Sequence, residues 1–197
     1  LVYSRHSSAA LDPVEKKPLY HFFPGREILS FGTLGCNLKC GFCQNWSISQ
    51  SGYDESMLRE ISPEEAAVMA AEKKSIGIAY TYNEPLINYE WVLETSVKVK
   101  ENNLKNVLVT NGYINEEPLR KLLPYIDAAN VDIKSFRNEF YKSDCGGCLS
   151  HVLRTAEIMF KAGVHLEFTN LIIPGRNDSE EEIYDLADWV SALSENI

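Results

Sequence analysis

The chain has 197 residues, of which 45% are hydrophobic and 24% charged, and its formal net charge is −9. This length allows one domain with a sizeable core. The acidic balance argues against nucleic-acid partners, which need a basic face. No apolar run approaches the ~20 residues of a membrane span. Five cysteines and no signal-peptide pattern favour a protein of the reducing cytoplasm.

Residues 1–27 contain Pro13, Pro18, Pro24 and Gly25, which predict an irregular, extended lead-in. Residues 28–197 form the core domain in this interpretation. The chain starts at Leu1 and stops within a helical pattern, so we expect the native protein to continue beyond both ends and the core to be incomplete at its C-terminal side.

The first predicted strand covers residues 27–35 and runs directly into Cys36. A helix follows at 62–74, with Ser62 as N-cap, Pro63 at the first helical position and Glu65 completing a capping box. Strands and helices then alternate: strand 75–82, helix 88–103, strand 105–112, helix 115–126, strand 128–135, helix 149–163, strand 164–173 and helix 179–195. Ser179 and Glu182 predict a second capping box at the start of the last helix.

Each predicted strand is a nearly continuous apolar run, which is typical of parallel strands that are covered on both faces. The fold class is therefore α/β. Periodicity alone does not decide between a doubly wound sheet and a barrel. In both architectures the ligand site lies at the carboxyl ends of the strands.

Polar residues follow or interrupt every predicted strand at this end. Such groups cost free energy inside apolar strands unless they are paired or bound, so their recurrence predicts one polar pocket. The pocket would be lined by residues from five segments: the three cysteines, "TYNEP" (81–85), "TNG" (110–112), Asp132 with Lys134, and Glu167 with Asn170 before "IIPGRND" (172–178).

The three cysteines that follow the first strand are Cys36, Cys40 and Cys43, in C-x3-C-x2-C spacing. Thiolates at this spacing can converge on one metal centre. Plain buried thiols are one alternative, and zinc with His21 or His151 as a fourth ligand is another. A [4Fe–4S] cluster takes four ligands, so three cysteines would leave one iron open to an external ligand.

This motif, with Phe42 before the last cysteine, resembles the signature of the radical S-adenosylmethionine (radical SAM) enzymes. "TYNEP" stands where glycyl-radical-enzyme activases, such as pyruvate formate-lyase activating enzyme, have Gly-Gly-Glu-Pro, and Tyr82-Asn83 replace the two glycines. "TNG", "DIK" and "IIPG" also look like strand ends of that group. "DPVEKKPLYHFFPG", "CQNW" and "AYTYNEP" resemble the radical SAM member of the AmmeMemoRadiSam system. The resemblance implies a partial (β/α)6 TIM-like barrel of parallel strands.

The resemblance also implies the cofactors and the reaction. SAM would complete the open iron of a [4Fe–4S] cluster through its amino and carboxylate groups. Reductive cleavage of SAM would give a 5′-deoxyadenosyl radical that takes a hydrogen atom from the substrate, which in an activase is a partner protein. The electron donor would be of the flavodoxin or ferredoxin type.

Residue roles follow from the same resemblance. The cysteines at 36, 40 and 43 would ligate iron, and Phe42 would lie near the adenine. Glu84 would accept from the SAM ammonium group, with help from Asn83. The remaining implied contacts to SAM come from Thr110 and Asn111 (ribose or carboxylate), Lys134 (carboxylate, oriented by Asp132), and the backbone of Ile173, Pro174 and Gly175 (adenine).

Simpler interpretations remain open for several of these residues. Thr110 to Gly112 fits an ordinary turn, and Asp132 with Lys134 fits a simple ion pair. Cys145 and Cys148 fit incidental thiols or a reversible disulfide. Two competing functions also remain, namely a radical SAM enzyme acting on a small molecule or RNA and a non-catalytic metal-binding module. Polar strand ends argue against the second, because a scaffold does not need them.

Overall fold

The computed structural model describes residues 3–50 and 58–194, and its centre is a six-stranded sheet of order β2-β3-β5-β6-β7-β8. The last five of these strands pair in parallel, and β2 pairs antiparallel with β3 at one edge. Their bounds are β2 Ser8–Pro13, β3 Glu27–Gly32, β5 Gly77–Tyr80, β6 Lys105–Thr110, β7 Ala128–Asp132 and β8 His165–Thr169. The described strands form an open sheet rather than a closed barrel. The predicted α/β class with parallel strands is confirmed.

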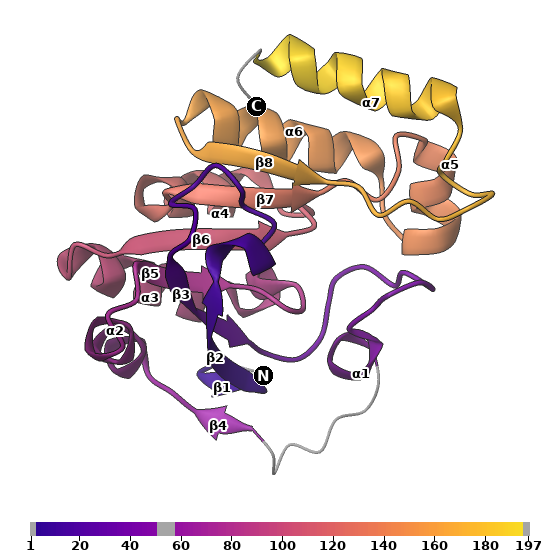
Figure 1. The fold of residues 1–197 in the computed structure, drawn as a ribbon. Coiled ribbons are helices and arrows are strands. Elements are labelled where there is room, and N and C mark those ends of the chain that lie inside the picture. Colours follow the sequence, from indigo (N-terminus) through magenta and orange to yellow (C-terminus); the bar gives the residue numbers. More distant parts are fainter. Residues whose placement is uncertain (1–2, 51–57, 195–197) are drawn as a thin grey trace.

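The larger helices connect the parallel strands, and Figure 1 shows α3, α4 and α6 on the far face of the sheet. A small separate ribbon pairs β1 (Arg5–His6) with β4 (Arg59–Glu60). The α-helices are α1 Trp46–Ser49, α2 Pro63–Glu72, α3 Tyr89–Glu101, α4 Glu116–Leu122, α5 Asn138–Phe140, α6 Leu149–Lys161 and α7 Glu180–Leu193. In the described chain each long predicted helix is present, with ends within a few residues of the prediction.

The two predicted capping boxes have different outcomes. At α2 both bonds form, because the Ser62 hydroxyl accepts from the Glu65 N–H and the Glu65 carboxylate accepts from the Ser62 N–H. At α7 only the first bond forms, from the Glu182 N–H to the Ser179 hydroxyl. The Glu182 carboxylate instead accepts from Ser135 and from the Phe136 N–H. The second box was therefore predicted wrongly, since this carboxylate ties α7 to the loop after β7.

The prediction of an irregular lead-in was also wrong in part. Residues 5–6 and 8–13 form strands, and Val14–Lys16 form a 3-10 turn. The chain then crosses the open face of the sheet, in front of β6, β7 and β8 (Figure 1). Asn130 on β7 donates to the Pro18 carbonyl at 2.9 Å, and Glu167 on β8 accepts from two backbone N–H groups of residues 20 and 21. The lead-in thus closes the face that the helices leave uncovered.

The register of the sheet puts the strand ends at one level. Phe31 pairs with Tyr80, Tyr80 with Leu108, Leu108 with Ala129, and Ala129 with Leu166. All five side chains are buried. Because the strands are parallel and aligned, the residues that follow them gather at the same edge. The predicted strands extended past this edge, so Asn111, Lys134 and Asn170 lie in loops.

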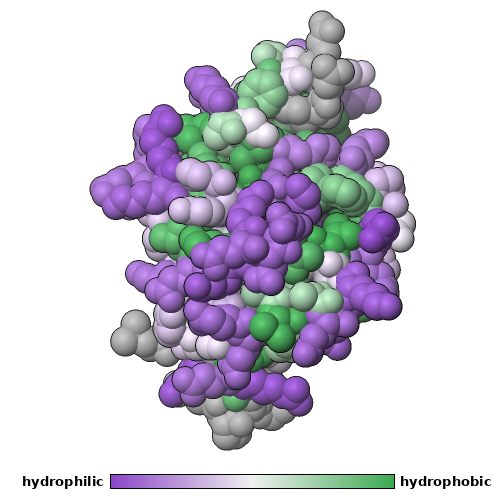
Figure 2. Space-filling view, turned by 90° about the vertical axis from the view of Figure 1, so that its left-hand side faces the viewer, coloured by the Kyte–Doolittle hydropathy of each residue, from purple (hydrophilic) through white to green (hydrophobic). Residues whose placement is uncertain are grey.

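The amino-end side of the sheet faces the viewer in Figure 2, where polar residues cover most of the surface and apolar residues are scattered between them. In residues 3–50 and 58–194, no helix combines the length and apolar character that crossing a membrane requires.

Candidate functional site

A cavity of ≈ 330 Å³ lies at the carboxyl ends of the parallel strands. It gathers most of the side chains that the sequence singles out. The predicted site residues that line it are Cys36, Cys40, Phe42, Cys43, Asn83, Glu84, Thr110, Asn111, Asp132 and Lys134. Ile173 and Gly175 do not line the cavity. Near the end of β8, Thr169 and Leu171 line it instead. Glu167 was expected here but faces the lead-in, and Asn170 donates to the Ile133 carbonyl.

Asn83 fixes the start of the cysteine loop. Its side-chain oxygen accepts from the Thr33 N–H at 3.0 Å, and its side-chain nitrogen donates to the Gly35 carbonyl at 2.7 Å. Both partners lie between the end of β3 and Cys36. The loop after β5 therefore holds the loop after β3 through one buried amide, which is a structural role that the sequence interpretation did not assign.

Tyr82 has a backbone φ of +73°, in the left-handed region that favours glycine. A side chain in this region costs about 1–2 kcal/mol. Two contacts offset that cost, since the Tyr82 hydroxyl donates to Asp12 at 2.5 Å and the Lys17 ammonium lies 4.5 Å from the ring centre. The chain thus holds Tyr82 in a conformation that glycine adopts more readily.

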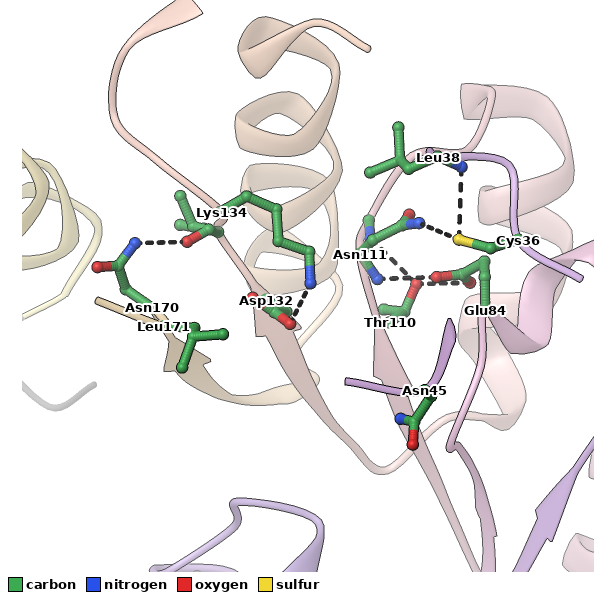
Figure 3. Close-up of polar contacts among 12 residues, drawn as sticks. Cys36, Leu38, Asn45, Glu84, Thr110, Asn111, Asp132, Lys134, Asn170 and Leu171 are labelled. Carbon is green, nitrogen blue, oxygen red and sulfur yellow. Dashed lines mark hydrogen bonds and ion pairs between the residues drawn. The ribbon is translucent and has the colours of Figure 1, made fainter. Parts of the chain in front are cut away.

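Glu84 is almost fully buried and its carboxylate accepts three hydrogen bonds. The donors are the Leu86 N–H at 3.0 Å, the Thr110 hydroxyl at 2.9 Å and the Asn111 N–H at 2.8 Å. Figure 3 shows this carboxylate directed at the end of β6 and close to Cys36. Burial raises its pKa above the usual range, although the donors act in the opposite direction. Thr110 and Asn111 therefore position Glu84.

The cysteine thiols differ in their surroundings. Cys36 accepts from the Leu38 N–H at 3.4 Å and from the Asn111 side chain at 3.6 Å (Figure 3). Burial raises the pKa of Cys36 to about 11. A hydrogen bond from Cys145 lowers the pKa of Cys40 to about 7. The surroundings of Cys36 and Cys40 therefore shift their pKa values in opposite directions.

Lys134 and Asp132 form an ion pair across the cavity from Glu84 (Figure 3). Burial acts against the charged ammonium, but Asp132 and the nearby thiols outweigh it, so the pKa of Lys134 lies above its usual value. The second carboxylate oxygen of Asp132 is buried and has no hydrogen-bond partner among the described residues. The pair predicted from the sequence is present, and one acceptor remains available beside the ammonium.

The donor set fits an iron–sulfur cluster better than a single ion. Zinc binds sulfur at ~2.3 Å, so its tetrahedral thiolates stand only about 3.8 Å apart. Within the described ranges, no three His, Cys, Asp or Glu side chains are close enough to hold one ion. Cluster thiolates each bind a different iron and need not meet so closely. Three thiols that line one cavity, with an unpartnered carboxylate oxygen and an ammonium opposite them, are compatible with a cluster and a charged co-ligand.

The histidines proposed as zinc ligands lie elsewhere. His21 is exposed and its ring approaches Glu167, whereas His151 stacks against Tyr113. His165 also pairs with Glu167. None of these rings lines the cavity, so neither His21 nor His151 lies among the three thiols as a fourth ligand.

Several cavity residues were missed by the sequence interpretation, and two of them are polar residues on the side of the lead-in. Lys16 and Asn130 line the cavity on the side of the lead-in. Asn130 lies two positions before Asp132 on β7, so strand alternation could have identified it. Lys16 carried no such signal, because only the crossing of the lead-in brings it to the sheet.

Comparison with known proteins identifies the family. Residues 31–190 match the model of the radical SAM superfamily, and the chain belongs to that superfamily. Its enzymes use a [4Fe–4S] cluster and SAM, so the cofactor prediction is confirmed at the level of the family.

The chain is 45% identical over 188 residues to the uncharacterized protein MJ0808 of Methanocaldococcus jannaschii, covering 95% of this chain and 56% of that one. It is 28% identical over 120 residues to the 4-hydroxyphenylacetate decarboxylase activating enzyme of Clostridium scatologenes, covering 60% and 38%. The chain thus spans roughly half or less of these relatives. The fold is similar to SuiB of Streptococcus suis bound to SAM, with TM-score 0.64, 16% identity, and coverage of 81% and 36%.

Proposed function

We propose that this protein is an enzyme that cleaves SAM reductively at a [4Fe–4S] cluster held by Cys36, Cys40 and Cys43, and abstracts hydrogen from a partner protein. The observation that carries the proposal is the single cavity onto which the three thiols, Glu84 and Lys134 all open. When bound, the two cofactors supply a 5′-deoxyadenosyl radical. We assign this activity to residues 28–197 as one catalytic core, with residues 1–27 covering its open face.

The charges of the cavity suit the charged end of SAM. The Glu84 carboxylate would accept from the amino group, and the buried setting would strengthen that bond. Lys134 would donate to the carboxylate, and Asp132 holds its ammonium in place. Asn83 and Asn111 support these groups by fixing the cysteine loop and the carboxylate of Glu84.

Further contacts to SAM are assigned by position. The Phe42 ring lines the cavity and contacts Phe140, with ring centres 5.6 Å apart, so it would form an apolar wall for the adenine. Thr110 would lie beside the ribose. Ile173 and Gly175 follow β8, and we propose that their backbone approaches the adenine from the rim. Gly175 has a φ of +76°, which favours glycine, and it carries no side chain that would block this approach.

A partner protein is the substrate class that we favour. The Clostridium relative is named as an activating enzyme for a decarboxylase, which is itself a protein. SuiB has also been crystallised with its precursor peptide SuiA. The cavity is open at the strand ends, where a loop of another protein can enter. The electron donor would be a flavodoxin or ferredoxin, and five free thiols suit a reducing cytoplasm.

The test is anaerobic reconstitution with iron and sulfide, followed by reduction and addition of SAM. We expect 5′-deoxyadenosine and methionine from the full-length protein. The Cys40→Ala variant should lose both the cluster absorption and the product. Cys148→Ala is the matched control and should retain both, because Cys148 does not line the cavity. A loaded wild-type protein that yields no 5′-deoxyadenosine would contradict the proposal.

A further inference from the structure

The cavity reaches back from the strand ends on the side of the lead-in. Asn130 on β7 and Val109 on β6 are paired in the sheet register, and both line the cavity. Asn130 lies two residues before Asp132, so its side chain is on the same face of β7 and about 6.6 Å farther from the carboxyl end. The lead-in crosses in front of this part of the sheet (Figure 1). None of the contacts proposed for SAM comes from this level of the sheet.

One hydrogen-bond acceptor remains unused at this level. The Glu167 carboxylate, next to Asn130 in register, accepts from the N–H groups of residues 20 and 21. The Asn130 side-chain nitrogen donates to the Pro18 carbonyl at 2.9 Å, which fixes the orientation of the amide because a carbonyl can only accept. Asn130 is only 1% exposed, and its side-chain oxygen has no hydrogen-bond partner among the described residues. A buried acceptor costs free energy unless water or a ligand donates to it.

Lys16 adds a positive charge to the same side of the cavity. The Asp12 carboxylate accepts from both Lys16 and Lys17, so two ammonium groups and one carboxylate leave one positive charge in excess. Lys17 is buried against Asp12, whereas the Lys16 side chain is 67% exposed and lines the cavity. Lys16 therefore lies where the cavity opens to solvent, and its ammonium group can pair with an anionic group that enters there.

We propose that this side of the cavity is the substrate subsite and that it binds an acidic peptide segment. A backbone N–H of the segment donates to the Asn130 side-chain oxygen, and a carboxylate of the same segment pairs with Lys16. Pro18 and Leu171 line the same cavity and offer apolar surface; Figure 3 shows Leu171 on the side away from Cys36. This inference rests on the proposed function, in which the substrate is a partner protein.

SAM is a poorer match for this level of the cavity. Its ammonium and carboxylate groups are complementary to Glu84 and Lys134, which lie nearer the carboxyl ends of the strands. SAM as a whole carries a net positive charge, so Lys16 would repel it rather than attract it. The cysteine loop covers one side of the cavity, and a substrate therefore has to reach SAM from another side.

The test is a calorimetric titration of the reconstituted full-length protein, oxidised and saturated with SAM, with the capped dipeptide acetyl-Ala-Glu-methylamide. The matched probe is acetyl-Ala-Gln-methylamide. We expect wild type to bind the glutamine probe about 2- to 5-fold more weakly, as for an exposed ion pair. Lys16→Met should bind both probes equally. Equal binding of the two probes to wild type, or no detectable binding of either, would overturn the proposal.

A second comparison addresses Asn130. Methylating each amide nitrogen of the glutamate probe in turn removes one donor at a time. One of these probes should bind wild type about 2- to 10-fold more weakly. In Asn130→Ala this difference should disappear, because the acceptor is gone. If Asn130→Ala instead weakens SAM binding and leaves the binding of all probes unchanged, the acceptor belongs to SAM and the subsite is refuted.

These titrations need neither an electron donor nor cleavage of SAM, so they separate the two proposals. Normal formation of 5′-deoxyadenosine without the expected probe preferences would contradict the subsite alone. The expected preferences without 5′-deoxyadenosine would contradict the catalytic proposal alone. The comparison with Lys16→Met still decides the matter if Asn130→Ala does not fold, because the exposed Lys16 side chain contributes little to stability.

Discussion

Replacing Asp12 by Asn tests how the lead-in is held beneath the cavity. The Asp12 carboxylate accepts from Lys17 at 2.8 Å, from Lys16 at 3.1 Å and from the Tyr82 hydroxyl at 2.5 Å. The Lys17 side chain is only 1% exposed, so its ammonium has little access to water when the carboxylate is neutralised. Breaking a buried ion pair by removing one partner typically costs about 3–5 kcal/mol.

We therefore expect Asp12→Asn to lower the free energy of unfolding by about 3–4 kcal/mol at pH 7. Urea denaturation with linear extrapolation measures this change. The matched control is Lys16→Met, because the Lys16 side chain is 67% exposed and its pair with Asp12 should contribute at most about 0.5 kcal/mol. A loss below about 1 kcal/mol in Asp12→Asn, or an equal loss in Lys16→Met, would refute the reasoning.

The same variant has a characteristic pH dependence. Burial opposes the charged carboxylate of Asp12, but its bonds from Lys17, Tyr82 and Lys16 outweigh burial and hold its pKa below the usual range. A lowered folded-state pKa gives stability that is complete above the unfolded value, about pH 4, and is lost as the pH falls toward the folded value. The difference between wild type and Asp12→Asn should therefore shrink below pH 4.

Three further variants address the site and the lead-in. Asn83→Ala leaves the Thr33 N–H and the Gly35 carbonyl without partners, so we expect a loss of about 2–4 kcal/mol in urea denaturation; a change below 0.5 kcal/mol would contradict the bracing role. Glu84→Gln should weaken SAM binding by about 10- to 100-fold in equilibrium dialysis while the cluster absorption stays; loss of the cluster would make Glu84 structural instead. Glu167→Gln removes one of two acceptors for lead-in amides, so hydrogen exchange at residues 19–23 should accelerate, and unchanged protection would exclude that anchor.

Local rules gave the correct result where one segment supplies all the interacting groups. The capping box of Ser62 and Glu65 lies within one helical turn, and both of its bonds form. The same rule failed at Ser179 and Glu182, because a distant partner competes for the carboxylate. The Ser135 hydroxyl and the Phe136 N–H, in the loop after β7, both donate to the Glu182 carboxylate. The spacing of Ser179 and Glu182 gives no information about these distant competing donors.

The prediction for the lead-in was wrong in part for a related reason. Its prolines correctly exclude a long helix, but they permit an edge strand that ends at Pro13. The bonds that carry it across the sheet join residues more than 100 positions apart, such as Pro18 with Asn130. No local pattern encodes such a pairing, so the role of Lys16 at the cavity could not be predicted.

The sequence by itself determined the α/β class, the order of the parallel strands and long helices, and the cysteine motif that identifies the superfamily, because each depends on periodicity or spacing within a short segment. Tertiary structure alone decided the roles of individual side chains. It made Asn83 a link between two loops and gave Glu84 its three hydrogen-bond donors. The physical reason is that these contacts join separate strand ends, and parallel packing is what brings those ends together.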